Sequence, residues 1–409
     1  MEYAAEIMLF DATSFTPRRA EVEVTADLAA AVAGADLWAV TIRRTGEVGG
    51  AMTVAMPSIL TEPWNPVGGT NWVYDNSLMR AIQDSAVFND PFTGLNLPQR
   101  VAYAEAYIEE GLPVGVTLDW VTLEFVPVGE IVVPDDAWAD WDAENQVFVT
   151  SAEKAVEEEV EYRTASAKYV CVYEDDVFET QWHDGSFFSV GDIAMLYIMF
   201  FDQAFEASAI YDEDAVSVYD ANMAAFRGFK IVSTDPLTTE FYTTNFALDA
   251  EEGLTDFRCG WPEYGFGQGA WQMITLGVMA EAAGELTFNQ PKADRLEVDW
   301  MSYIGGPSID ILAAHLETAA AENYIPYAPT MSQFVTEEEA ATRWANYQDW
   351  YARKGHFFVG TGPYYLERAF AVEGTVILKH NPNYKDLADK WAGYSAPKVA
   401  DVEVDGAGR

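Results

Sequence analysis

The sequence contains few basic residues for its length. Of its 409 residues, 23 are Lys or Arg and 66 are Asp or Glu, which gives a formal net charge of −43 at pH 7. Binding to phosphate groups requires clustered Lys and Arg side chains, and the sequence contains no basic run. The composition therefore argues against nucleic acid and anionic membrane surfaces as partners, and it is typical of a solvated, highly soluble surface.

Cysteine and histidine are scarce as well. The two cysteines, Cys171 and Cys259, permit one disulfide but do not require it. Cys171 lies in the apolar, strand-like stretch 169–173, which favours a buried free thiol at that position. The four histidines form no cluster, and neither a CxxC nor an HExxH motif occurs, so the sequence predicts no metal site and no cofactor.

Among the segments that are present, residues 181–192 (QWHDGSFFSVGD) are the most informative. Asp184 and Gly185 are turn residues, because Asp can bond to its own backbone and Gly adopts positive φ without steric cost. Ser189 and Asp192 have the spacing of a capping box, and the apolar run 193–201 that follows predicts a buried helix. On physical grounds alone, this pattern predicts a strand that turns sharply into a helix, and it indicates no particular chemistry.

Together with Trp182, this pattern resembles the signature of family 5 extracellular solute-binding proteins, the dipeptide- and oligopeptide-binding receptors of ABC importers. Three further segments are similar to motifs of the same family and occur in the same order. They are residues 64–66 and 72–75 (WNP and WVYD), residues 360–366 (GTGPYYL), and residues 375–384 (TVILKHNPNY).

The resemblance implies an α/β fold, namely a lobe of the periplasmic-binding-protein type II kind with a mixed β-sheet and flanking helices. The lobe is expected over residues 49–409, opening on a strand at 51–56 and carrying an insertion within 248–348. Residues 1–48 are expected to be the tail of an upstream unit, with strands at 20–24 and 37–43. Because little sequence follows the last motif, the chain resembles one lobe of a two-lobe receptor.

Two loops are candidates for contact with a solute: residues 64–72, which are rich in Trp, Asn and Gly, and residues 261–271, which are rich in aromatic residues and Gly. They combine flat apolar faces with amide groups. The alternative is that their Trp rings pack beneath the loops and their Asn side chains satisfy turns. The candidate ligand-binding residues are Trp64, Asn65, Asn71, Trp72, Tyr74, Trp261 and Trp271. The family motifs themselves are interpreted as scaffold, and these residues are Trp182, His183, Asp184, Gly185, Asp192, Gly360, Thr361, Gly362, Pro363 and Tyr364.

Several helix ends and turns can be predicted from local pattern. Thr336 and Glu339 have the spacing of a capping box, and Gly355 is expected to end the helix that they begin. Ser308 is a candidate N-cap. The Asp235-Pro236 pair between the apolar stretches 226–232 and 237–241 predicts a hairpin.

The resemblance implies a binding protein rather than an enzyme. The expected function is the substrate-binding component of an ABC importer, which captures a peptide or oligosaccharide outside the cytoplasm and delivers it to a membrane permease. Two alternatives stay open: a carboxylate-dependent glycoside hydrolase, in which Trp residues would serve as sugar platforms, and a non-transporting surface binding module.

The expected location is periplasmic or cell-surface, in association with the membrane. No stretch approaches the ~20 apolar residues of a membrane span. Residues 1–10 also lack the basic region that opens a secretory signal, so no signal peptide is visible. Either a leader has been removed or the chain is an internal piece of a longer protein, and we expect the second.

Overall fold

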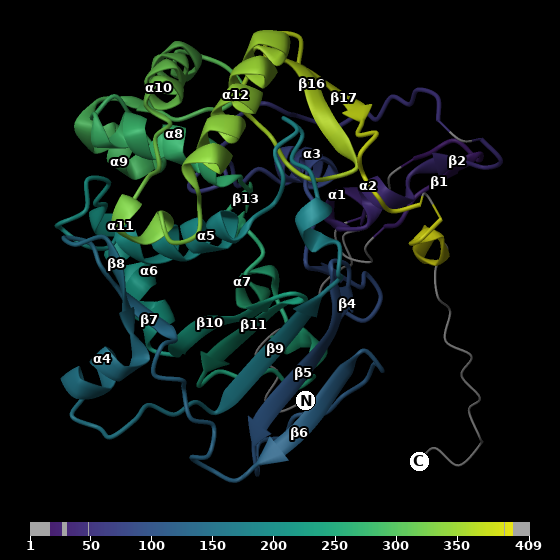
Figure 1. The fold of residues 1–409 in the computed structure, drawn as a ribbon. Helices are drawn as coiled ribbons and strands as arrows, with labels where there is room; N and C mark the ends of the chain where they lie inside the picture. Colours follow the sequence, from purple (N-terminus) through teal and green to yellow (C-terminus); the bar gives the residue numbers. More distant parts are fainter. Residues whose placement is uncertain (1–16, 27–30, 48, 388, 396–409) are drawn as a thin grey trace, which may run out of the picture.

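A computed structural model of the chain describes residues 17–26, 31–47, 49–387 and 389–395 (Figure 1). Its main sheet contains β5 (Val101–Glu109), β6 (Val121–Val126), β7 (Trp138–Asp142), β8 (Val147–Thr150), β9 (Ala167–Tyr173), β10 (Phe226–Thr234) and β11 (Leu237–Thr243). The strand order is β6-β5-β9-β11-β10-β7-β8. β5 and β6 are parallel, whereas the other neighbouring pairs of this sheet are antiparallel. The chain therefore has the predicted α/β composition and a mixed sheet.

Helices form a second layer above this sheet (Figure 1). Helix α5 (Val190–Asp202) contacts both β7 and α8 (Trp271–Ala282), so it lies between the sheet and the helical layer. Its side chains are apolar and buried almost all round, as expected of a helix inside a core. The outer helices include α10 (Ser308–Glu322) and α12 (Glu337–Lys354).

Shorter elements connect and cover the two layers. The helical ones are α4 (Ser151–Glu157), α6 (Glu213–Met223), α7 (Asp256–Cys259), α9 (Gln290–Leu296), α11 (Ala328–Met331), η1 (Val177–Glu179), η2 (Glu251–Gly253) and η3 (Ala392–Ser395). The short strands are β3 (Val87–Asn89), β4 (Asn96–Pro98), β12 (Glu263–Tyr264), β13 (Gly267–Gln268), β14 (Leu286–Thr287), β15 (Asp299–Trp300), β16 (Tyr364–Phe370) and β17 (Thr375–His380). The expected insertion, residues 248–348, contributes α7 to α11 and the first part of α12.

The N-terminal segment packs against the rest of the molecule. It contains β1 (Val22–Glu23), α1 (Ala31–Gly34), α2 (Trp38–Thr41) and β2 (Arg43–Arg44). Of these, α1 and α2 lie beside α3 (Val73–Ile82) in Figure 1. Trp38 donates its indole N–H to the Ser77 carbonyl at 2.9 Å, and Arg80 donates to the Ala33 carbonyl at 2.9 Å. The described part of residues 1–48 therefore packs on α3, through a small apolar cluster in which Val24, Ala35, Trp38 and Ala39 meet Ala81.

Two strands predicted in this part of the sequence are wrong. Residues 37–43 contain the helical turn α2, in which the Thr41 hydroxyl donates to the Leu37 carbonyl at 2.6 Å. Residues 51–56 form no strand and are mostly exposed. A strand needs a neighbour for its backbone groups, and alternating apolar residues do not show whether that neighbour exists.

The helix caps and turns predicted from residues close together in sequence agree better with the structure. Ser189 and Asp192 make both hydrogen bonds of the predicted capping box, and β10 and β11 form the predicted hairpin. Gly355 ends α12 with φ of 71°, as predicted. The capping box predicted at Thr336 forms only in part: Thr336 accepts from the Glu339 N–H at 3.1 Å, but the Glu339 side chain accepts from the Ser189 hydroxyl instead. The N-cap predicted at Ser308 is wrong: the cap position belongs to Pro307, and the Ser308 hydroxyl accepts instead from the Ser302 N–H.

The free thiol predicted at Cys171 is also wrong. Cys171 on β9 and Cys259 on α7 form a disulfide across 88 residues of sequence. α7 is held against the sheet because Tyr173 and Thr239 each donate a hydroxyl hydrogen bond to the Cys259 carbonyl at 2.9 Å. The sequence does not show that α7 packs against the sheet, so it could not show that Cys171 and Cys259 lie close enough to form a disulfide.

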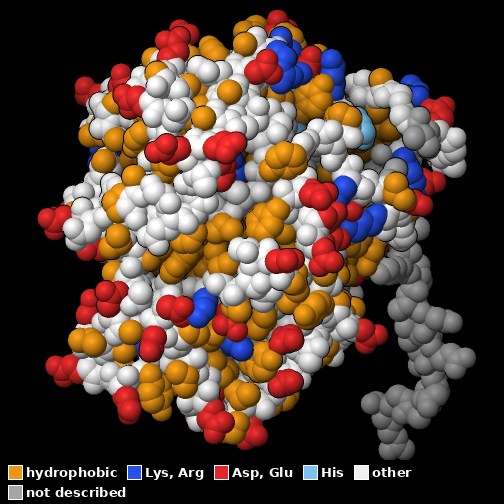
Figure 2. All heavy atoms as spheres, viewed as in Figure 1, with side chains coloured by type: hydrophobic (Ala, Val, Ile, Leu, Met, Phe, Trp, Pro, Cys, Tyr) orange, Lys and Arg blue, Asp and Glu red, His pale blue; other side chains and the backbone are white. Residues whose placement is uncertain are grey.

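The surface reflects the composition. Figure 2 shows acidic side chains spread over the face viewed in Figure 1, with fewer basic ones between them. Apolar side chains gather across the middle of the same face, between the sheet and the outer helices. No helix within the described ranges is long and apolar enough to pass through a membrane.

Candidate functional site

Two of the family-like motifs meet directly, although they are far apart in sequence. The His183 N–H donates to the Gly360 carbonyl at 2.9 Å, and the Gly360 N–H donates to Nδ1 of His183 at 3.1 Å. Nε2 of the same ring then donates to the Gly362 carbonyl at 3.1 Å. Burial lowers the pKa of His183 to about 4, so the ring is neutral and serves as a fixed bridge between the segments.

The glycines of residues 360–362 allow this segment to lie against the end of α3. A Cβ atom on Gly360 would lie 2.2 Å from the Ile82 carbonyl oxygen, and one on Gly362 would lie 2.3 Å from the Gln83 carbonyl oxygen. Thr361 is buried and receives a hydrogen bond from the Gln268 side chain at 2.9 Å. Pro363 is buried and Tyr364 half-buried, where β16 begins.

The carboxylates of the first motif are buried and hydrogen-bonded. Asp184 accepts from the Gln272 amide at 2.9 Å, and Asp192 accepts from the Trp271 N–H at 2.9 Å. Arg343 of α12 holds both oxygens of Asp192, at 2.8 and 2.7 Å. Sequence reasoning did not identify Arg343 as the partner, because it lies 151 residues further along the chain.

Four of the seven candidate ligand-binding residues are core residues in this structure. Trp64, Asn65, Trp261 and Trp271 are each 0% exposed. Asn65 donates to the carbonyls of Phe288 and Met301. Because protein atoms surround these side chains, they stabilise the loops and present no surface to a solute in this conformation.

The other three candidates lie nearer to the surface. Trp72 is 38% exposed, Asn71 is exposed and Tyr74 is half-buried. The Trp72 indole donates to the Ser58 carbonyl at 3.0 Å, and the rings of Trp72 and Tyr74 lie 5.8 Å apart. None of these three residues lines either of the two cavities described next.

The two candidate loops nevertheless line the larger of those cavities, through residues that were not predicted. This cavity, which we call the main cleft, has a volume of about 820 Å³. Its walls come mainly from the end of α5, the exposed side of α6, the start of α7 and the β12–β13 hairpin. The lining residues are Val67, Leu196, Met199, Phe200, Gln203, Ala204, Asp214, Ala215, Val218, Tyr219, Asn222, Thr255, Asp256, Phe257, Glu263, Tyr264, Gly265, Phe266, Asn289 and Pro291.

Three polar atoms in the wall of the main cleft lack hydrogen-bond partners. They are Nε2 of Gln203, Oε2 of Glu263 and the hydroxyl of Tyr264, and none bonds to another described residue. A buried polar group without a partner costs about 1–3 kcal/mol, so such groups are uncommon in native proteins. A largely apolar cleft with a few convergent polar groups is the usual form of a small-molecule site.

Two carboxyl groups give the main cleft its electrostatic character. Burial raises the pKa of Asp256 to about 7, even though its Oδ1 accepts hydrogen bonds from the Ala86 and Val87 N–H groups at 2.6 and 3.2 Å. Burial and the neighbouring Asp256 raise the pKa of Glu263 well above its usual value. Both groups therefore carry protons more readily than exposed carboxyl groups do.

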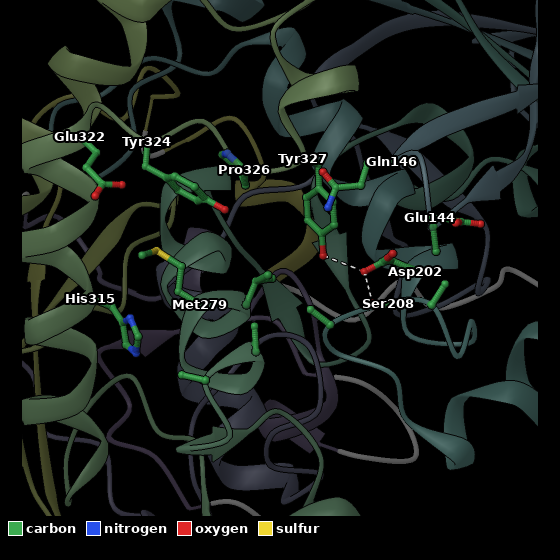
Figure 3. Close-up of a pocket in the computed structure, with 16 residues that line it drawn as sticks. Glu144, Gln146, Asp202, Ser208, Met279, His315, Glu322, Tyr324, Pro326 and Tyr327 are labelled. Carbon is green, nitrogen blue, oxygen red and sulfur yellow. Dashed lines mark hydrogen bonds between the residues drawn. The ribbon is translucent and has the colours of Figure 1, made fainter.

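A second cavity of about 510 Å³ lies beside α8 and α10 (Figure 3). Its buried carboxylate, Asp202, accepts hydrogen bonds from Ser208 at 2.6 Å and from Tyr327 and Trp141 at 2.8 Å each. Figure 3 shows Tyr327 and Ser208 pointing toward Asp202, while His315 lies at the other end of the cavity. Asp202 already accepts hydrogen bonds from three protein donors. The main cleft, by contrast, has polar atoms without partners among the described residues, so it is the better candidate for a ligand site.

Searches against models of protein families and against curated proteins found no match to this chain. Within the described parts of the chain, no three His, Cys, Asp or Glu side chains are grouped so that they could hold a metal ion. Glu263 and Tyr264 could have been found from sequence, because they lie between Trp261 and Trp271. Gln203 and Asp256 lie in no such aromatic loop, so the sequence did not mark them as candidate site residues.

Proposed function

We propose that the chain is the substrate-binding component of an ABC importer, with a lobe of the periplasmic-binding-protein type II kind. It would capture peptides or similar small solutes outside the cytoplasm and deliver them to a membrane permease. The observation that carries this proposal is the main cleft. Both loops that the sequence marked as candidates for solute contact, by their aromatic and amide content, contribute to its wall through Val67 and residues 263–266.

Two further observations support the proposal. His183 joins the first motif to the Gly360–Gly362 segment by three hydrogen bonds, consistent with the scaffold role expected for both. The Cys171–Cys259 disulfide suits an oxidising compartment, since disulfides persist mainly outside the cytoplasm. A non-transporting surface module would share these features, and a requirement for the chain in solute uptake by cells would distinguish the importer.

The test is a calorimetric titration of the chain with a panel of di- and tripeptides and cello-oligosaccharides. The proposal predicts that at least one class of solute binds with one-to-one stoichiometry. The bound solute should be recovered unchanged by mass spectrometry after prolonged incubation. Failure of every panel member to bind would contradict a solute-binding function.

A glycoside hydrolase is the second candidate, because Asp256 and Glu263 place two carboxyl groups in the wall of one cleft. Such enzymes use one carboxyl as an acid and another as a base or nucleophile. The same incubation separates the two functions. Shortened oligosaccharides that disappear from the products of a Glu263→Gln variant would favour the hydrolase.

A further inference from the structure

The main cleft has an acidic end. Glu263 stands on β12 and Asp256 on α7, and both line the cleft. The positive charge that acts on Glu263 is that of Arg80, but this guanidinium already pairs with Asp36 at 3.1 Å and donates to the Ala33 carbonyl at 2.9 Å. The Arg80 guanidinium thus acts on both Asp36 and Glu263, and the negative charge of the neighbouring Asp256 opposes its effect on Glu263.

The rest of the cleft is aromatic and aliphatic. Phe200 and Phe257 lie 4.7 Å apart between ring centroids, and both line the cleft together with Met199, Tyr219 and Phe266. Aromatic faces attract organic cations, and the attraction is larger where water is excluded. An apolar cleft closed at one end by carboxyl groups is suited to a molecule with a hydrophobic body and a positive head.

The unpartnered polar atoms point to a ligand that can both donate and accept hydrogen bonds. Oε2 of Glu263 has no partner within the described ranges, nor does Nε2 of Gln203, whose side chain is only 9% exposed. An ammonium group can donate to the Glu263 carboxylate. A carbonyl or hydroxyl elsewhere on the ligand can accept from the Gln203 amide.

We propose that the main cleft selects a small organic ammonium ion, with its charged head against Glu263 and its apolar body against Phe200 and Phe257. This inference rests on the proposed binding function and names the class of solute. The overall charge of −43 favours the same class, because a strongly acidic surface attracts cations and raises their rate of encounter.

Binding of an ammonium ion requires an ionised carboxylate, so it is linked to proton release. The titratable and charged groups that act on Glu263 are Asp36, Arg80 and Asp256, with the phenol of Tyr264 next in sequence, and Asp84 acts in turn on Asp256. The phenol stays protonated, because burial raises its pKa well above the usual value. The wild-type affinity for an amine should therefore increase as the pH rises from about 5.5 to 8, below the pKa of an aliphatic amine.

The probes for the test are phenethylamine, its neutral analogue 2-phenylethanol and the anion 3-phenylpropionate, each titrated calorimetrically into the full chain. We expect the amine to bind about tenfold or more tightly than the alcohol, and the acid to bind weakest. Two buffers of different ionisation enthalpy should reveal proton release with the amine and none with the alcohol. Equal binding of amine and alcohol, or no binding of the amine, would overturn the ammonium assignment.

The matched variants are Glu263→Gln in the main cleft and Glu322→Gln in the wall of the second cavity. We expect Glu263→Gln to weaken binding of the amine about tenfold or more and to leave the alcohol unchanged, whereas Glu322→Gln changes neither. Unaltered amine binding by a folded Glu263→Gln variant would refute the proposal. If that variant does not fold, the wild-type pH dependence decides, because an affinity that stays constant from about pH 5.5 to 8 excludes the carboxylate contact.

Failure of this inference can be distinguished from failure of the proposed function. If a peptide or oligosaccharide binds while the amine does not, the ammonium assignment fails and the binding function stands. If neither the solute panel nor the three probes bind, both fail together.

Discussion

His183 shows how one neutral side chain can connect segments that are distant in sequence. Its ring accepts from the Gly360 N–H and donates to the Gly362 carbonyl, and both of those residues are buried. The sequence suggested the turn through Asp184 and Gly185, but it gave no sign that His183 faces the later motif. Only the resemblance to a family placed the two motifs in one unit.

Replacing His183 by Ala should cost about 2–4 kcal/mol in the free energy of unfolding, because two buried backbone groups lose their partners. The pKa of His183 is lowered to about 4 in the folded state, against about 6.5 in the unfolded chain. Its contribution is therefore complete above about pH 6.5 and declines as the pH falls toward 4. Urea unfolding of both proteins at several pH values measures this, and a constant difference across that range would contradict it.

For Asp256 we expect the stability of the protein to depend on pH in the opposite direction. Its folded pKa of about 7 exceeds the unfolded value of about 3.9, so the folded state binds more protons between these values and stability falls as the pH rises through them. Asp256→Asn keeps an oxygen for the Ala86 and Val87 N–H groups. It should be more stable than wild type at pH 8 and equal to it near pH 4, as measured by thermal unfolding.

Asp142→Asn is the matched control for this change. Asp142 accepts hydrogen bonds from the Asn145 side chain and backbone, and these contacts lower its pKa. The control should therefore be no more stable than wild type at pH 8. Stabilisation of both variants, or of neither, would argue against a raised pKa at Asp256.

At the scale of elements, Arg343 joins three helices. From α12 it reaches Asp192 at the start of α5 and the Gln272 amide oxygen on α8, both at 2.8 Å. Arg343→Met would leave Asp192 buried without its counter-charge, which should cost about 3–5 kcal/mol. Arg353→Met, which removes an exposed arginine of the same helix, should change stability by about 0.5 kcal/mol or less. Chemical denaturation of both variants would compare them, and equal losses would contradict the bridging role.

The elements that could be predicted are those fixed by local contacts. The capping box at Ser189 and the glycine end at Gly355 each involve residues within a few positions of one another. The strand predicted at 51–56 failed because strand formation depends on a distant neighbour. Glu339 shows the same limit, since its side chain accepts from the Ser189 hydroxyl at 2.7 Å instead of completing its own capping box.

At the scale of the whole molecule, the disulfide ties the wall of the main cleft to the sheet. Cys259 ends α7, whose first residues Asp256 and Phe257 line the cleft, and Cys171 lies in β9, an interior strand of the main sheet. The location of the cleft could be anticipated from two aromatic loops. Its lining could not be anticipated, because three of the four Trp side chains that made those loops conspicuous, Trp64, Trp261 and Trp271, are buried in the core.

Replacing both cysteines by alanine should lower the free energy of unfolding by about 2–5 kcal/mol, since the unfolded chain regains the entropy of a long loop. Reduction of the wild-type protein should lower its melting temperature, whereas reduction of the double variant should not. A melting temperature unaffected by reductant, with complete reduction verified by thiol titration, would contradict this.

The measurement that tests solute binding in the main cleft most directly is calorimetry on a variant in which the cleft is filled. Val218 on α6 lines the cleft and is 60% exposed, so Val218→Trp should occupy the cleft without disturbing the core. Val156 on α4 is 78% exposed, lies outside the cleft lining and provides the matched Val156→Trp control. The tightest-binding solute of the panel should lose its affinity for Val218→Trp and keep it for Val156→Trp. Undiminished binding by the Val218→Trp variant would contradict the assignment of the cleft as the binding site.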